Sequence, residues 1–73
     1  MEYRVKFKDD IGNEIISMPF ETEEEAEQII SEDMEKFKKC YRFSNYECKE
    51  FENKTTFRIK DKGLYVSWER LWK

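Results

Sequence analysis

The sequence TEEEAEQIISEDMEKFKKC, residues 22–40, predicts one long amphipathic helix. Its apolar residues recur three or four positions apart, which places them on one helical face. They are Ala26, Ile29, Ile30, Met34 and Phe37, and Tyr41 continues the pattern. Thr22 is a favourable N-cap and forms a capping box with Glu25, and the first-turn glutamates suit the positive end of the helix dipole. Lys38 and Lys39 suit the negative end.

Two strands joined by a turn are predicted ahead of this helix. Over residues 3–8, aromatic or aliphatic residues alternate with basic ones, which indicates a strand with one apolar and one basic face. Residues 9–13 form a turn. Residues 14–20 form the returning strand, with Ile16, Met18 and Phe20 on one side. Because Pro19 has no N–H to donate, this strand is expected to lie at an edge or to stop there.

Three shorter strands are predicted after the helix, over residues 43–51, 55–60 and 64–68. Turns separate them, and Gly63 is expected to supply a positive φ in the second turn. In the middle strand Phe57 and Ile59 share one face, so the intervening basic residues point the other way. Residues 69–73 are expected to form either a helical turn or a tail.

The predicted order of elements is therefore ββαβββ, an α+β fold. An antiparallel sheet with one amphipathic helix packed on one face buries the apolar surfaces of both. The chain is expected to form a single domain, residues 1–73, whose small core depends on its aromatic residues. Trp68 is expected in this core. Trp72 is expected either to pack against it or to act as an exposed interface anchor.

The residue types present argue against most catalytic and metal-binding chemistry. The chain has no histidine, its two glycines are isolated, and it contains no CxxC pair. It lacks the usual general base and a glycine-rich phosphate loop, so we expect no enzymatic activity, no metal site and no cofactor. Cys40 and Cys48 are expected to be reduced, partly buried thiols. Without a secretory signal or an apolar run of roughly 20 residues, a cytoplasmic location with no membrane contact is expected.

Charge is the feature of the sequence that points to a partner. Residues 9–35 contain eleven acidic residues and no basic residue, whereas residues 36–73 contain eleven basic and five acidic residues. The net charge of −3 is thus a small sum of large opposed contributions. Segregated charge shapes the external field of a protein more than its fold, and exposed helices usually mix Glu with Lys.

The acidic segment predicts a surface that docks on a basic site of a partner protein and inhibits it. On a helix, Glu24, Glu27 and Glu35 are expected to share an exposed stripe, with carboxylates spaced comparably to phosphates along a nucleic acid. Such a surface could occupy a cleft that normally binds DNA or RNA. The predicted partner-binding residues are Asp9, Asp10, Glu24, Glu27, Glu32 and Glu35. An ordinary solvated helix face is the alternative interpretation of this segment.

The basic carboxyl-terminal half supports a second hypothesis, a nucleic-acid-binding module. Tyr41, Phe43 and Tyr65 could stack on bases beside it. Its predicted contact residues are Lys36, Lys38, Lys39, Arg42, Arg58 and Lys60. The acidic net charge opposes such binding at long range, so nucleic acid is the less favoured partner. A homodimer held by sheet edges or by Trp72 is a third hypothesis.

Short motifs follow one another over residues 3–30. They are Tyr3-Arg4-Val5-Lys6-Phe7, the Asp10…Gly12 turn, and Phe20-Glu21-Thr22 leading into Glu24-Glu25-Ala26. This arrangement resembles the arm-type DNA-binding domains of phage integrases, in which the sheet and the following turn carry basic residues. Here acidic residues occupy those positions, which argues against DNA binding by this half. In size, acidity and layout, the whole chain is similar to small inhibitors that phages and mobile elements make against host proteins.

Overall fold

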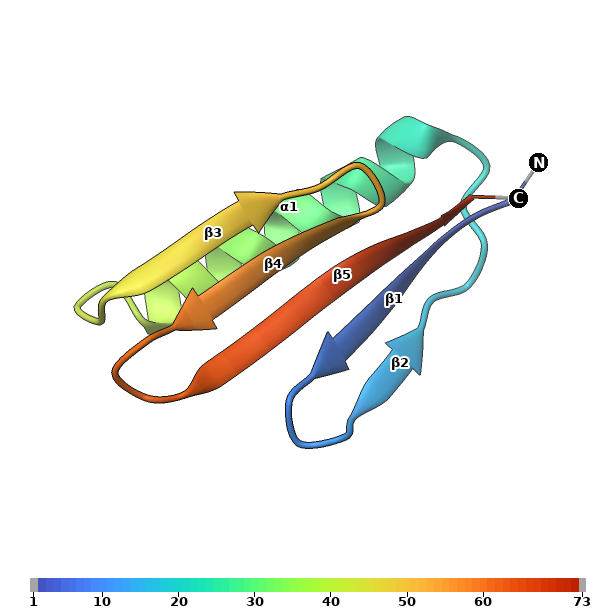
Figure 1. Cartoon of the computed structure of the whole chain (residues 1–73). Coiled ribbons are helices and arrows are strands. Elements are labelled where there is room, and N and C mark those ends of the chain that lie inside the picture. The colour runs from blue at the N-terminus through green and yellow to red at the C-terminus, as the bar shows by residue number, and fades with distance from the viewer. Residues whose placement is uncertain (1, 73) are drawn as a thin grey trace.

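The computed structural model describes residues 2–72 and has the predicted α+β fold with element order ββαβββ. Its elements are β1 (Tyr3–Asp9), β2 (Glu14–Ile16), α1 (Glu23–Cys40), β3 (Tyr46–Glu50), β4 (Lys54–Ile59) and β5 (Leu64–Trp72). The five strands form one antiparallel sheet in the order β2-β1-β5-β4-β3. Figure 1 shows α1 lying along one face of this sheet, with no described element over the other face.

The boundaries of α1 agree with its capping signals. Thr22 is the N-cap, and its hydroxyl oxygen accepts a hydrogen bond from the backbone N–H of Glu25 at 3.2 Å. The carboxylate of Glu25 in turn accepts from the Thr22 hydroxyl at 3.2 Å. Tyr41 ends the helix, where its N–H donates to the carbonyl of Phe37 at 3.0 Å. The capping box predicted from the sequence is therefore present in a side-chain-to-side-chain form.

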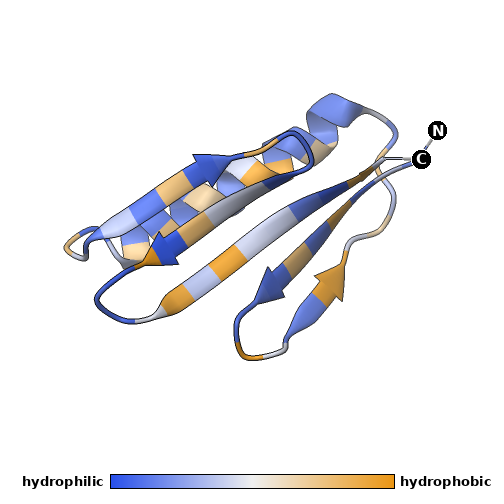
Figure 2. Ribbon diagram, viewed as in Figure 1, coloured by the Kyte–Doolittle hydropathy of each residue, from blue (hydrophilic) through white to orange (hydrophobic). Residues whose placement is uncertain are grey.

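The core lies between α1 and the central strands. Trp68 and Phe57 are completely buried, and the ring of Phe37 lies 5.6 Å from each, centroid to centroid. The indole N–H of Trp68 donates to the Asp33 carboxylate at 3.2 Å, which satisfies the polar end of this buried ring. Figure 2 shows that hydrophobic and hydrophilic residues alternate along β4 and β5 near the turn that joins these strands, as expected for strands with one buried face. The other buried apolar residues are Val5, Ala26, Ile30, Met34, Ile59 and Val66.

β2 ends earlier than the sequence predicts. After Ile16, the hydroxyl oxygen of Ser17 accepts the N–H of Val5 at 2.9 Å, so a side chain replaces the next carbonyl of the ladder. Pro19 follows and cannot donate to the ladder. Phe20 returns to β1 only as an isolated bridge. The pairing of β1 with its outer neighbour is therefore short and irregular.

β5 is longer than predicted and runs to Trp72. Residues 69–72 thus extend a central strand and form neither a helical turn nor a tail, while Lys73 lies outside the described residues. The side chain of Trp72 is partly buried, and its ring meets Tyr3 edge-on with centroids 5.1 Å apart. Packing is thus the outcome for Trp72. Gly63 has the predicted positive φ, at 67°.

Candidate functional site

The two layers of the fold separate the charges of the chain. Residues 21–40, which include α1, carry eight acidic and three basic residues. Successive side chains of a strand point to opposite faces of the sheet. Phe57 and Trp68 are buried under the helix, so the residues directly before and after each of them in sequence point away from the helix. Within residues 2–72, this open face carries seven basic residues and three acidic ones, Glu14, Glu47 and Glu69. The basic residues are Arg4, Lys6, Lys8, Lys49, Lys54, Arg58 and Lys60. The molecule is therefore negative on its helix side and positive on its sheet side.

Three of the predicted partner-binding residues lie exposed on α1. Glu24 and Glu32 are exposed, and no ion pair reaches either of them within residues 2–72. The side-chain amide of Gln28 donates to the Glu32 carboxylate at 3.2 Å. Glu35 is also exposed but lies 3.5 Å from the ammonium of Lys38. Negative charge is thus least compensated toward the amino-terminal end of the helix.

Glu27 does not share the exposed stripe predicted for it. Its carboxylate turns toward the sheet and accepts hydrogen bonds from Nε and Nη2 of Arg70, the latter at 3.1 Å. The Arg70 side chain is only 8% exposed and also donates to the Thr55 hydroxyl at 2.8 Å. The hydrogen bond with Glu27 raises the pKa of Arg70 above its ordinary value. Glu27 therefore links the helix to the sheet through its ion pair with Arg70. Its carboxylate is not available to bind a partner protein.

Asp9 and Asp10 lie at the other end of the molecule from the first turn of α1. The preceding Phe7 stacks on Phe37, near the carboxyl end of the helix, with centroids 6.2 Å apart. The Asp9 carboxylate accepts the N–H of Asn13 at 2.9 Å and so holds its own turn together. Asp10 lines a shallow hollow with Arg58 of β4 and with Lys60, which follows that strand. The structure thus places these two aspartates apart from the helix carboxylates.

The predicted nucleic-acid-binding residues fall into two groups. Arg58 and Lys60 lie on the open sheet face, where the Arg58 guanidinium sits 5.8 Å from the centroid of the Tyr65 ring. The ammonium of Lys60 lies 3.3 Å from the Glu47 carboxylate, and that hydrogen bond, with the charge of Lys49, lowers the pKa of Glu47. The other members, Lys36, Lys38, Lys39 and Arg42, lie in the helix layer or in the loop after it. The structure does not bring the two groups together on one face.

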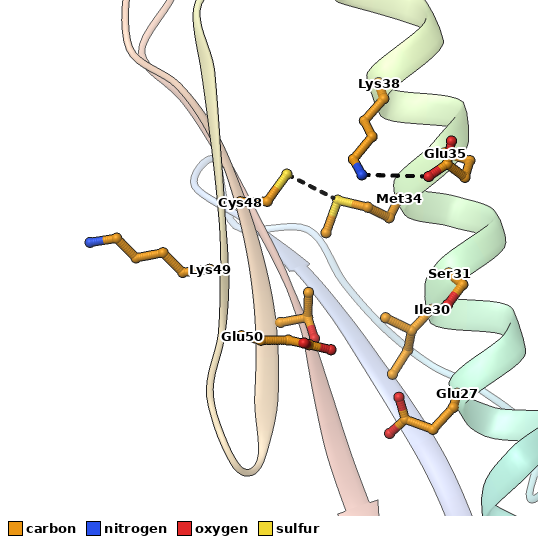
Figure 3. A pocket seen from close by; sticks show the side chains of 10 residues that line it. Glu27, Ile30, Ser31, Met34, Glu35, Lys38, Cys48, Lys49 and Glu50 are labelled. Atoms are coloured by element: carbon orange, nitrogen blue, oxygen red, sulfur yellow. Dashed lines mark hydrogen bonds and ion pairs between the residues drawn. The ribbon is translucent and has the colours of Figure 1, made fainter.

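A groove of about 290 Å³ runs between α1 and β3 (Figure 3). From β3, Cys48 points toward the helix, where its sulfur lies 3.6 Å from that of Met34, while Lys49 points away. Partial burial raises the pKa of the Cys48 thiol. Both cysteines are free, and both residues are exposed. The prediction of partly buried thiols is therefore wrong for Cys40, whereas the sulfur of Cys48 is partly covered by the helix. Within residues 2–72, no three histidine, cysteine or carboxylate side chains are grouped to hold a metal ion.

Sequence reasoning missed the role of Arg70 and the full extent of the basic sheet face. Arg70 lies two residues from Trp68 and two from Trp72, so the period of a strand could have placed it on the buried face. The sequence alternation predicts that the basic residues of β1 form one face of that strand. Only the sheet order, with β5 between β1 and β4, joins them to Arg58 and Lys60.

The described residues, 2–72, contain no helix with both the length and the apolar content needed to cross a bilayer. Comparisons of the chain with protein-family models, curated proteins and solved structures give no match.

Proposed function

We propose that this protein is a small non-enzymatic binding protein whose acidic helix surface docks on a basic site of a partner protein and blocks it. The observation that carries the proposal is a group of exposed carboxylates around the amino-terminal turns of α1. Within residues 2–72, no basic side chain forms an ion pair with any of them. This acidic surface consists of Glu21, Glu23, Glu24, Glu25 and Glu32.

Physical chemistry favours docking by charge for such a surface. Four of these carboxylates crowd at the start of α1, and Glu32 lies about two turns, or roughly 10 Å, further along the helix. They repel one another, and within residues 2–72 no ion pair offsets that repulsion. A basic cleft relieves that repulsion, and a cleft that binds nucleic acid already accepts negative groups in a row. Association is then steered by charge and weakens as salt increases. An acidic inhibitor acting in the cytoplasm on a nucleic-acid-handling host protein, as phages and mobile elements make, fits this chemistry.

Displacement from immobilised DNA tests the proposal. A lysate of the source organism is bound to DNA-cellulose, and the column is eluted with the purified chain at low salt. We expect the wild-type chain to release one or a few nucleic-acid-binding proteins. The variant Glu23→Gln/Glu24→Gln/Glu32→Gln is expected to release at least ten-fold less.

A matched variant controls for net charge. Glu2→Gln/Glu52→Gln/Asp61→Asn also removes three negative charges from exposed positions, none of which lies on α1. It is expected to release the same proteins as the wild-type chain. Equal release by all three chains, or by none, would show that the acidic surface does not dock on such a partner.

A second candidate function is nucleic-acid binding by the open sheet face. It is favoured by the stacking of Arg58 on Tyr65 beside Lys60, because a cation over an aromatic ring suits both phosphate and base. Titration of labelled single- and double-stranded DNA and RNA at low salt tests it. No binding at tens of micromolar protein, or equal binding by Arg58→Gln/Lys60→Gln, would eliminate this candidate.

A further inference from the structure

The two edges of the sheet are protected to different degrees. β2 spans only Glu14–Ile16, and the irregular segment with Pro19 follows it, so an added strand finds few N–H and C=O groups there. β3 spans Tyr46–Glu50 without proline or glycine, and no described strand lies beyond it. β3 is therefore the edge that can accept another strand.

The hydrogen-bond pattern of β3 defines which backbone groups are available. The N–H of Phe51 donates to the carbonyl of Lys54, and the N–H of Lys60 donates to the carbonyl of Asn45. Because inward and outward groups alternate along an antiparallel strand, the odd-numbered residues of β3 bond to β4. The residues whose N–H and C=O groups point outward are Tyr46, Cys48 and Glu50.

We propose that β3 pairs with β3 of a second copy of this chain, antiparallel and centred on Cys48. In this register each outward-pointing residue meets an outward-pointing residue of the partner, which allows about six backbone hydrogen bonds. Glu47 stands opposite the partner's Lys49 at both symmetric positions. Registers centred on residue 47, 49 or 50 instead place identical charges opposite each other, which is unfavourable. The order of charges in β3 therefore complements itself in this register.

Exposed aromatic residues at the two ends of β3 support the same register. Phe43 is 90% exposed before the strand, and Phe51 is 50% exposed after it. Pairing about Cys48 sets Phe51 opposite the partner's Asn45, two residues from the partner's Phe43. Phe43 itself lies in the turn before β3, close to that asparagine in the chain. Each end of the paired strands thus gathers two apolar rings that are exposed in the single chain.

The dimer has a defined arrangement of its layers. The two-fold axis of an antiparallel strand pair is perpendicular to the sheet, so both helices lie on one side. The open basic faces become one surface on the other side. Dimerisation therefore enlarges the charge separation found within each copy.

A charge-exchange experiment tests this pairing. Sedimentation of the wild-type chain between 5 and ~500 µM is expected to show a reversible dimer. Lys49→Glu alone and Glu47→Lys alone each create like-charge pairs across the axis, and each is expected to weaken dimerisation by about ten-fold. An equimolar mixture of the two variants restores both opposite-charge pairs and is expected to form a heterodimer. Lys36→Glu, on the helix, is expected to behave as wild type.

Cross-linking supplies a second measurement. Cα atoms in a hydrogen-bonded strand pair are about 5.5 Å apart, within the range of a disulfide. Diamide, which takes two electrons and two protons from a pair of thiols, is expected to link Cys40→Ser chains through Cys48 and to leave Cys48→Ser chains unlinked. A strictly monomeric wild-type chain at the highest concentration overturns the proposal. So does a dimer that Lys49→Glu leaves intact or that links only through Cys40.

Discussion

The helix layer and the open sheet face both carry many charges, but they neutralise them differently. On the sheet face, opposite charges meet between neighbouring strands and within β3. Lys6 lies 3.0 Å from Glu14, and Glu47 lies within 3.4 Å of both Lys49 and Lys60. On the amino-terminal part of α1, Glu27 alone has such a neighbour, Arg70, and within residues 2–72 the carboxylates of the acidic surface form no ion pair. The sheet face is thus a mixed surface with a positive excess, whereas the acidic surface is negative throughout.

A second difference lies within the helix itself. Glu27 and Asp33 turn toward the sheet, where they bind Arg70 and Trp68. Glu24 and Glu32 point to solvent and take part in no contact between the layers. The acidic run is therefore a mixture of structural and unpaired carboxylates. Only the second kind is free to meet a partner.

The largest effect is expected from Arg70→Ala, which breaks the bond between the layers. The change leaves Glu27 without its buried partner and removes the donor to Thr55. We expect a loss of about 3 kcal/mol in the free energy of unfolding, measured by urea denaturation. Arg58→Ala on the open face is the matched control and is expected to cost less than about 0.5 kcal/mol. Similar losses for both variants would contradict the assignment of Arg70 as an interlayer contact.

A smaller effect is expected from Thr22→Ala. The variant removes the hydroxyl that accepts the N–H of Glu25 and leaves the acidic surface unchanged. Loss of an N-cap of this type costs about 1 kcal/mol of stability. Thr22→Ser retains the hydroxyl and should restore most of it. If Thr22→Ala were as stable as the wild type, the capping box would have no energetic role.

Local patterns were enough to predict α1, the strand alternation and the turn at Gly63, because each depends on residues close in sequence. The distribution of charge depends on contacts between distant residues. Whether Glu27 is exposed is decided by Arg70, which lies 43 positions later in the chain. The period of the helix alone could not reveal that partner.

The same limit applies to both predicted binding sites. The sequence groups Asp9 and Asp10 with the helix carboxylates because all of them lie in one segment without basic residues. The direction of β1 instead carries them to the opposite end of the molecule. The sequence likewise groups Lys36 with Arg58 because both lie in the basic carboxyl-terminal half, yet the two residues lie in different layers. The sequence therefore shows which segments are acidic or basic, but it does not show which of these charged side chains share one surface of the folded protein.

Relieving repulsion on the acidic surface is expected to change stability only slightly. Glu24→Gln/Glu32→Gln removes two outward carboxylates, neither of which forms an ion pair within residues 2–72. We expect the free energy of unfolding to stay equal or to rise by up to about 0.5 kcal/mol at low salt. The gain should vanish in 0.5 M NaCl, where exposed charges are screened. A loss above about 1 kcal/mol would mean that these glutamates have a structural role.

The smallest effect concerns acid pH and the paired glutamates of the sheet face. Hydrogen bonding and charge from lysines lower the pKa of Glu14 and Glu47 below the ordinary 4.5. Near and below that value the unfolded chain therefore binds more protons than the folded one, so stability falls as pH decreases. The contribution is complete above about pH 5 and is lost as pH falls through the lowered pKa values of the folded state.

Glu14→Gln/Glu47→Gln should make unfolding curves between pH 5 and 3 less sensitive to acid. Since both pairs are exposed, 0.5 M NaCl should reduce the sensitivity of the wild-type chain in the same way. If the double variant and the wild-type chain had identical acid profiles at low salt, ion pairing on the sheet face would not contribute to stability. The sheet face would then differ from the acidic surface in its net charge, and the pairing of its charges would make no difference to stability.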